Sequence, residues 1–477
     1  MEMDNGAGME FLAVAPEMIV LVGAIAAILS GSFLRRDRQW ISRVIAIAAL
    51  LSSAALAGLA FAQPVRTVFE GSFAVDVGTN AARLIICLAT VLVIVLGVEE
   101  LTAGPQESET YALMLLSALG AMVMSGTSDL LILAVGFLLA SIPLYALIGM
   151  NRSATGAEAA MKTYLLGAFS GIALLLGVTL LYALAGGTAY ATLQAELADM
   201  PAGVIALGLV GVLTGLVFKA GAVPAHFWVP DAAQGSTVSA AAFLTTVPKI
   251  GALVAIYRLL LVIPPSVNWP LLIGLLAAAS MTLGNFAAFT QSDARRLLGW
   301  STVSQAGYLL LPVAVAGLAD LALPSLLLYL AGYAVTNLGA FAVIAATGRT
   351  PLEKYRGLAR ENPWLSVALV VSLLSLVGTP PTAVFFGKLT TFTAAWDGGL
   401  AWLVAIAAIN TVASLFYYLR WIVPAFQRTS APAAGQAISP QPRRWATQSA
   451  YAAAVVVIVM GTLSGLLLPL FEGPLIR

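Results

Sequence analysis

Four lysines are the residues of this chain best placed to do chemistry, because each lies inside a long apolar stretch. They are Lys162, Lys219, Lys249 and Lys388. A charge at the middle of a bilayer costs on the order of 2.5–3.5 kcal/mol, so charges at such places require compensation or a function. A buried ammonium group can release its proton, whereas the guanidinium group of arginine effectively cannot. Every arginine can be placed in a loop or at the end of a stretch. The lysines therefore indicate proton transfer inside a membrane.

The neighbours of these lysines leave two interpretations open. His226 follows Lys219 by seven residues, so in a continuous helix the two side chains would share one face about 10 Å apart. The histidine could then relay protons near neutral pH, or it could be a satisfied core residue. Glu158 and Lys162 stand four residues apart, which suits a site for protons and equally a stabilising helix pair. Lys162 also lies only four residues into its stretch, so its ammonium group could reach the interface.

Helix-breaking residues stand beside two of the lysines. Gly221 and Pro224 follow Lys219, and the run Gly-Thr-Pro-Pro at 378–381 precedes Lys388. Proline kinks a helix, and in a membrane such backbone is tolerated only where protein or water satisfies it. The breaks fall in the seventh and twelfth apolar stretches, five apart, as two five-span repeats would require. We therefore expect interrupted helices in a transporter-like core, with simple packing kinks as the alternative.

The composition predicts an integral membrane protein. Of the 477 residues, 60% are hydrophobic and only 9% are charged, whereas soluble domains hold about 25% charged residues. The net charge of +1 gives no reason to expect nucleic acid as a partner. A single histidine and a single cysteine, Cys87, exclude a His/Cys-rich metal site, an iron–sulfur site and an intrachain disulfide. The acidic N-terminus lacks the cations of a cleavable signal peptide, so we expect it to be retained.

Fourteen apolar stretches are long enough to cross a bilayer. They lie at residues 12–34, 41–62, 80–98, 109–126, 128–149, 158–185, 202–228, 237–263, 268–291, 297–318, 324–347, 364–396, 399–424 and 447–470. No long polar segment interrupts them, so we expect one membrane domain. If alternate loops are assigned to one side, most of the 23 cations collect there, and only Arg66, Arg83, Arg258 and Arg477 fall on the other side. Because cations collect in the cytoplasm, we expect both termini outside it.

Six strings of this sequence resemble those of the antiporter-like membrane subunits of respiratory complex I, and most closely subunit N, the bacterial counterpart of mitochondrial subunit 2. They are EAAMKTYLLGAFSG (158–171), FKAGAVPAHFWVPDAAQGS (218–236), TTVPKIGALVAIYR (245–258), QSDARRLLGWSTVSQAGYLL (291–310), SLVGTPPTAVFFGK (375–388) and NTVASLFYYLR (410–420). The resemblance runs from roughly residue 109 to residue 424, and the last string favours subunit N within the superfamily.

The resemblance implies an all-α polytopic membrane protein of about fourteen transmembrane helices, with two inverted five-helix repeats and discontinuous seventh and twelfth helices. It divides the chain into an N-terminal three-helix region (1–108), a first repeat (109–263), a second repeat (264–424), and a cytoplasmic connector with a C-terminal helix (425–477). The family's central hydrophilic axis would correspond here to Lys219, His226, Lys249 and Lys388. The head of its sixth helix would correspond to Lys162 and Glu158.

The implied function is proton translocation by a non-redox subunit of NADH:quinone oxidoreductase, coupled to quinone reduction elsewhere in the complex. The subunit itself would hold no cofactor, and NAD, FMN, iron–sulfur clusters and quinone would belong to partner subunits. Its partners would be the lipid bilayer and the other membrane subunits of complex I. It would lie in the bacterial inner membrane with both termini on the periplasmic side. A cation/proton antiporter and a membrane subunit of a related hydrogenase are the alternatives.

Two positions depart from the family's pattern. Leu138 stands where the fifth helix usually carries a glutamate, and Gln305 stands where a histidine is common. That glutamate normally partners the lysine of the seventh helix, which is Lys219 here. The departures add a third alternative, a structural subunit with impaired pumping.

Overall fold

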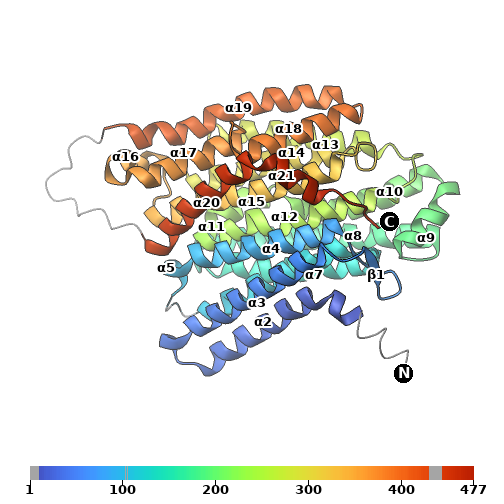
Figure 1. The fold of residues 1–477 in the computed structure, drawn as a ribbon, viewed down its shortest axis with the longest axis horizontal. Coiled ribbons are helices and arrows are strands. Elements are labelled where there is room, and N and C mark those ends of the chain that lie inside the picture. The colour runs from blue at the N-terminus through green and yellow to red at the C-terminus, as the bar shows by residue number, and fades with distance from the viewer. Residues whose placement is uncertain (1–9, 103, 105, 429–442, 477) are drawn as a thin grey trace.

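The chain folds into a bundle of long helices that lie roughly side by side (Figure 1). The structure is a computed structural model, and it describes residues 10–102, 104, 106–428 and 443–476. In this part of the chain, twelve helices are long and apolar enough to cross a membrane. They are α2 (Ala15–Phe33), α3 (Trp40–Ala60), α4 (Val77–Leu96), α6 (Glu107–Gly126), α7 (Leu130–Gly149), α8 (Ala154–Ala185), α10 (Ala202–Ala220), α12 (Val238–Leu260), α13 (Trp269–Ala288), α15 (Ala322–Thr347), α19 (Ala401–Phe426) and α20 (Arg444–Thr462). The predicted class, an all-α polytopic membrane protein, is confirmed.

The other two predicted stretches fall on helices that are less apolar or shorter. One corresponds to α14 (Ala294–Val313), which carries buried serine, threonine and glutamine side chains. The other corresponds to α17 (Pro363–Val377) followed by α18 (Ala383–Asp397). A total of fourteen crossings stays a prediction, because these helices do not qualify as spans by length and apolarity alone.

Two helices are interrupted where glycine and proline predicted it. The helix α10 ends before Gly221, which has a φ of 74°, and the chain resumes as the short helix α11 (Trp228–Gly235). Likewise α17 ends before Gly378, which has a φ of 93°, and α18 begins after Thr382. Positive φ values favour glycine. Each break therefore follows from a residue that ends a helix in a left-handed conformation.

Short elements connect the long helices. The helical ones are α5 (Val98–Leu101), α9 (Tyr190–Glu196), α16 (Leu358–Glu361), α21 (Ser464–Leu467) and the 3-10 turns η1 (Arg36–Arg38), η2 (Leu197–Asp199), η3 (Leu352–Tyr355) and η4 (Leu468–Phe471). A two-stranded antiparallel hairpin, β1 (Arg66–Val68) and β2 (Phe73–Val75), follows α3. This hairpin was not predicted from the sequence.

The centre of the bundle is the helix α12. Every residue in its apolar window is buried, against a third of the window in α2, α3 and α19. Figure 1 shows α12 and α15 in the middle of the bundle, with α2 at one edge and α19 at the other. The edge helices direct their apolar side chains outward, as expected for contact with lipid or with other membrane proteins.

The first turn of α12 is held by a carboxylate from an earlier part of the chain. Both oxygens of Glu100 accept hydrogen bonds from the backbone, one from Val238 N and one from Ser239 N, each at 2.8 Å. The neighbouring Glu99 accepts a hydrogen bond from Trp445 N near the start of α20. Acids at helix N-termini satisfy free N–H groups and oppose the positive end of the helix dipole. These two glutamates therefore act as helix caps.

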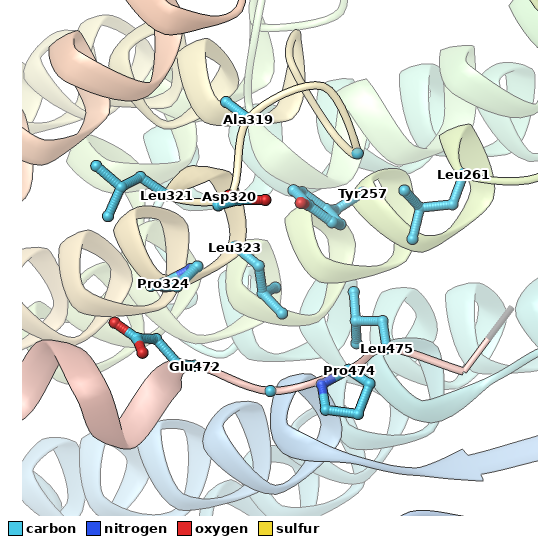
Figure 2. A pocket seen from close by; sticks show the side chains of 12 residues that line it. Tyr257, Leu261, Ala319, Asp320, Leu321, Leu323, Pro324, Glu472, Pro474 and Leu475 are labelled. Atoms are coloured by element: carbon cyan, nitrogen blue, oxygen red, sulfur yellow. The ribbon is translucent and has the colours of Figure 1, made fainter.

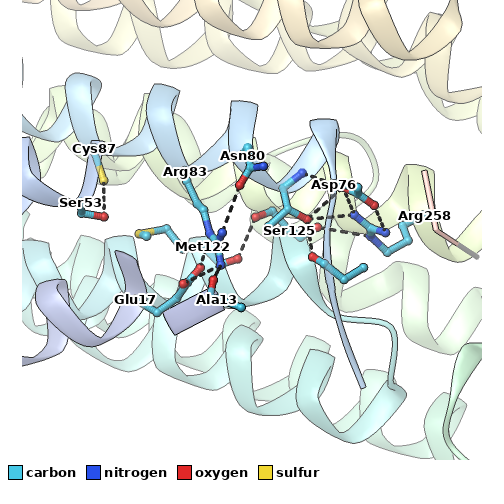
Figure 3. Close-up of polar contacts among 12 residues, drawn as sticks. Ala13, Glu17, Ser53, Asp76, Asn80, Arg83, Cys87, Met122, Ser125 and Arg258 are labelled. Carbon is cyan, nitrogen blue, oxygen red and sulfur yellow. Dashed lines mark hydrogen bonds and ion pairs between the residues drawn. The ribbon is translucent and has the colours of Figure 1, made fainter. Parts of the chain in front are cut away.

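Two buried ion pairs join helices at the opposite end (Figure 3). Arg83 on α4 binds Glu17 on α2 at 2.7 Å, and Arg258 in the last turn of α12 binds Asp76 at 2.8 Å. The sequence pattern assigns both arginines to the ends of membrane spans, where cations indicate which side faces the cytoplasm. Arg258 lies in the last turn of α12 and Arg83 in the second turn of α4, and the side chains of both are fully buried. Internal pairing rather than membrane sidedness therefore accounts for their positions.

Candidate functional site

Three of the predicted lysines are buried inside the bundle. The exposed fractions of Lys219 on α10, Lys249 on α12 and Lys388 on α18 are 1%, 1% and 3%. Each ammonium nitrogen lies over an aromatic ring, at 5.3, 4.8 and 4.0 Å from the ring centres of Phe137, Tyr333 and Tyr308 respectively. Within the described residues, none of the three forms an ion pair with a carboxylate. The faces of aromatic rings, which attract cations, take part of the role of a counter-ion here.

Lys388 obtains its other contacts from the break between α17 and α18. Its Nζ donates hydrogen bonds to Leu376 O at 3.2 Å and Val377 O at 2.8 Å. The last carbonyls of a helix have no partner in their own helix and form the negative end of its dipole, so the end of α17 is a natural site for an ammonium group. A Cβ at Gly378 would lie 2.9 Å from Cδ of Lys388, so glycine also makes room for this side chain.

Lys219 has a different environment at the other break. It lies in the last turn of α10, and its Nζ has no hydrogen-bond partner among the described residues. The carbonyl of Phe218 accepts from Trp228 Nε1 at 3.1 Å, and the carbonyl of Val217 accepts from Ala222 N at 3.1 Å. These contacts occupy two carbonyls at this helix end, and the aromatic ring of Phe137 on α7 is the nearest cation–π contact of the lysine.

His226 lies in the loop between α10 and α11, and 1% of it is exposed. The continuous helix that would put its side chain on one face with Lys219 is not formed, because α10 ends at Ala220 between the two residues. Neither ring nitrogen has a side-chain hydrogen-bond partner among the described residues. The imidazole ring instead lies 5.5 Å from the ring of Trp300 on α14.

Lys249 contacts the same helix as His226 does. Its Nζ donates a hydrogen bond to Thr302 O on α14 at 3.2 Å. The hydroxyl group of Tyr333 on α15, whose ring lies beside the ammonium group, lies 3.0 Å from Thr302 Oγ1 and donates to Thr245 O at 2.9 Å. A tyrosine between α12, α14 and α15 thus completes the surroundings of this lysine.

Gln305, one turn further along α14, joins this region to Lys388. Its Nε2 donates to Leu376 O at 2.9 Å, and that carbonyl also accepts from Lys388. Its Oε1 accepts from the hydroxyl group of Tyr329 at 2.6 Å. A side-chain amide donates and accepts hydrogen bonds but does not titrate, so Gln305 can order this chain of contacts without storing a proton. Trp300, Thr302 and Gln305 place α14 beside three of the predicted groups.

Lys162 and Glu158 do not join the buried lysines. The Nζ of Lys162 lies 2.7 Å from Glu158 and 2.9 Å from Asp231 on α11, and the lysine side chain is 48% exposed. Asp231 also binds Arg296 on α14 at 2.6 Å. This charged cluster connects α8, α11 and α14 at the bundle surface. We did not single out Asp231 and Arg296, although Asp231 stands directly after the first break.

The two positions that depart from the family's pattern differ in burial. Leu138 on α7 is 42% exposed, whereas its neighbour Phe137 is 1% exposed and lies beside Lys219. Successive residues of an α-helix point about 100° apart, so these two side chains face different surroundings. Gln305 is fully buried and hydrogen-bonded. Of the two departures, only Gln305 belongs to the buried polar region.

A cavity of about 620 Å³ lies at the C-terminal end of α12 (Figure 2). Tyr257 of α12, Asp320 of the loop before α15, and Glu472 near the C-terminus are among its lining residues. None of the three buried lysines lines it. In the described part of the chain, no group of three or more His, Cys, Asp or Glu side chains is arranged to hold a metal ion.

Comparison with known proteins places the chain in a family. Residues 127–414 match the family described as "NADH:quinone oxidoreductase/Mrp antiporter, TM". The NADH-quinone oxidoreductase subunit N of Mycobacterium sp. (strain JLS) is 55% identical over 455 residues, which are 95% of this chain and 97% of that protein. A chain of respiratory complex I from Thermus thermophilus, solved with bound aureothin, is 33% identical with a TM-score of 0.82, covering 96% of this chain and 100% of that one.

The Mrp complex of Dietzia sp. DQ12-45-1b contains a chain of the same fold, with a TM-score of 0.84 over 97% of this chain and 96% of that one, at 24% identity. The fold alone therefore does not separate the two kinds of complex. The family match spans more than half of the chain, and the mycobacterial relative aligns over nearly its whole length. On this basis the chain belongs to the family of NADH:quinone oxidoreductase and Mrp antiporter membrane subunits.

Proposed function

We propose that this chain is the N-type membrane-arm subunit of a proton-translocating NADH:quinone oxidoreductase. It moves protons through Lys219, His226, Lys249 and Lys388, coupled to quinone reduction elsewhere in the complex. The relative that is 55% identical bears the name of that subunit. The observation that carries the proposal is the burial of three lysines without a described carboxylate partner, two of which, Lys249 and Lys388, lie beside the polar helix α14.

The contacts suggest how the lysines would hold and release protons. A charged lysine is favoured by the ring beneath it and by the carbonyl it binds, which is Thr302 O for Lys249 and Val377 O for Lys388. A neutral amine loses most of the attraction to the ring, so release of the proton loosens the side chain. Like charges repel strongly in a low-dielectric interior. Protonation of one lysine therefore favours release from a neighbouring one.

The test replaces Lys249 and Lys388 singly by alanine in the assembled complex. Proton pumping driven by NADH is measured beside the rate of NADH oxidation, with Lys354→Ala as the matched control because Lys354 is exposed on η3. The two buried variants should pump fewer protons per NADH oxidised, and the control should match the unaltered complex. Full pumping by both buried variants would rule out the proposed roles of these lysines.

The remaining parts of the proposal concern the surroundings of the subunit. The partners are other membrane subunits of complex I, and NAD, FMN, iron–sulfur clusters and quinone are bound by other subunits. The subunit lies in the bacterial inner membrane with both termini in the periplasm. Its helices are grouped into four regions, which are residues 1–108, 109–263, 264–424 and 425–477. Identification of the subunits that co-purify in mild detergent separates this assignment from an antiporter or hydrogenase complex. Cysteine labelling from each side of the membrane tests the sidedness.

A second candidate, a subunit that supports the complex but pumps poorly, is favoured by the surroundings of Lys219. Its Nζ has no hydrogen-bond partner among the described residues. The glutamate usual in the family is replaced by Leu138, whose side chain is 42% exposed on α7. Leu138→Glu restores that acid. More protons pumped per NADH in this variant would indicate that the unaltered subunit has lost part of the family's function, whereas unchanged pumping would give no support to that loss.

A further inference from the structure

The helices α2 and α3 form a groove on the surface of the bundle that none of the proposed proton-transfer groups uses. A cavity of about 630 Å³ runs between them, and all of the residues that line it are apolar. On α2 the lining extends from Ala15 to Ala26, which is about 16 Å along a helix axis. This length matches the hydrocarbon depth of one membrane leaflet, which is about half of 30 Å.

A second cavity of about 510 Å³ adjoins the groove at the end where α2 begins and α3 ends. The two cavities share Leu12 and Ala15 among their lining residues. The second cavity also contains Gln63, Arg66 and Arg83. Polar and cationic groups therefore lie at the level where the two helices end, which is where lipid headgroups would be found.

The two arginines in this cavity are not equivalent. The guanidinium group of Arg83 is bound by both carboxylate oxygens of Glu17 at 2.7 Å (Figure 3), so its charge is neutralised inside the protein. Arg66, on strand β1, donates only a long hydrogen bond of 3.4 Å to Gln63, and its buried Nε has no partner among the described residues. Arg66 is therefore the cation available to a ligand.

We propose that these two cavities together bind one anionic phospholipid, with its phosphate at Arg66 and an acyl chain in the α2–α3 groove. The groove does not suit a protein helix, because α2 and α3 approach closely at Gly23, where an added methyl group would collide with Ala49. Small residues therefore line the base of the groove, and an acyl chain fits into it. The charge of Arg66 selects an anionic headgroup over a zwitterionic one.

The experiment uses the assembled complex, purified in mild detergent and depleted of lipid. Phosphatidylglycerol or phosphatidylcholine with the same acyl chains is added back, and the bound lipid is counted by native mass spectrometry. The unaltered complex should bind one phosphatidylglycerol that Arg66→Gln binds at least about tenfold more weakly, since a hydrogen bond to a charged group is lost. Arg38→Gln is the matched control, because Arg38 is an exposed cation at the other end of the same helix pair. It should bind phosphatidylglycerol like the unaltered complex.

Two further measurements distinguish the contribution of the lipid headgroup to binding from that of the acyl chain. Val22→Trp fills the groove beside α2 and should weaken the binding of both lipids, whereas millimolar inorganic phosphate should not displace the bound lipid. Equal affinity of the unaltered and Arg66→Gln complexes for phosphatidylglycerol would overturn the proposal. So would displacement by phosphate, or a cross-link from Val22→Cys to another subunit, which would show that protein covers the groove.

Discussion

The buried pair of Asp76 and Arg258 permits a sharp test of what holds the central helix in place. Two guanidinium nitrogens of Arg258 lie 2.8 and 2.9 Å from the two oxygens of Asp76, and both side chains are fully buried. The same guanidinium group donates to Ile476 O and to Thr79 Oγ1, each at 3.0 Å. Arg258 therefore ties the last turn of α12 to the start of α4 and to the C-terminal segment.

Asp76→Asn isolates the charge in this network. Asparagine can still accept the capping hydrogen bond from Thr79 N, which Asp76 accepts at 3.0 Å, because both residues are good N-caps. What is lost is the counter-ion of a buried guanidinium group. Removal of one partner of a buried ion pair costs about 3–5 kcal/mol, so we expect the free energy of unfolding to fall by that amount. Asp76→Asn combined with Arg258→Gln should cost less than the sum of the two single changes, because no unpaired charge remains.

The measurement is the denaturation midpoint of the subunit within the detergent-purified complex, for both single variants and the double variant. The control is Asp37→Asn, whose partner Arg35 is exposed, and an exposed pair contributes at most about 1 kcal/mol. A loss of less than about 1 kcal/mol in Asp76→Asn would contradict this role of the buried pair. So would losses of the two single variants that simply add in the double variant.

The same pair determines a pH dependence. Burial alone would raise the pKa of Asp76, but the charge and hydrogen bonds of Arg258, together with backbone N–H groups, hold this pKa below its ordinary value. A carboxyl group with a lowered pKa stabilises the folded state above its unfolded pKa of about 4, and this contribution is lost only as the pH falls through the lower folded pKa. The difference in stability between the unaltered protein and Asp76→Asn should therefore be the same at pH 7 and pH 5.

Three other outcomes follow from single contacts. Gly378→Ala should reduce proton pumping, because alanine is strained at a φ of 93° and its Cβ would press on Lys388. The control is Gly348→Ala, which introduces backbone strain alone, because Gly348 has a φ of 64° and an added Cβ there would meet no atom within 4 Å. Glu100→Gln should destabilise α12 by roughly 1 kcal/mol in the same denaturation assay, because the charge at its N-terminus is lost; an unchanged midpoint would contradict the cap. Gln305→Ala should lower pumping more than the rate of NADH oxidation, because the hydrogen bond to the carbonyl that Lys388 shares is lost; equal loss of both rates would argue against this role.

Much of the fold could be predicted from local sequence. Apolar stretches predicted the helices that cross the bundle, because the length of an apolar run decides whether it can span a bilayer. Glycine and proline predicted the two breaks, since each break begins at a glycine with positive φ. The hairpin of β1 and β2 was missed because its strands are only three residues long, which is too short for a pattern to be recognised.

The candidate site was predicted less completely. Apolar surroundings identified Lys219, Lys249 and Lys388 as unusual, and all three are buried. Lys162 was predicted to belong with them on the same grounds, but it lies in a half-exposed cluster with Asp231. For His226, the shared face with Lys219 required a continuous helix, and α10 ends before the histidine. Local sequence shows that a charge is in an apolar stretch, but not which way its side chain points.

Local patterns of residues are enough to establish a helical membrane protein, two interrupted helices and a few lysines at places where charge is costly. The contacts of each of these groups depend instead on how the helices pack together. Lys249 meets Thr302, which is 53 residues away, and Arg258 meets Asp76, which is 182 residues away. Because hydrogen bonds and ion pairs act over about 3 Å, the partner of a buried charge is selected by helix packing and not by proximity along the chain.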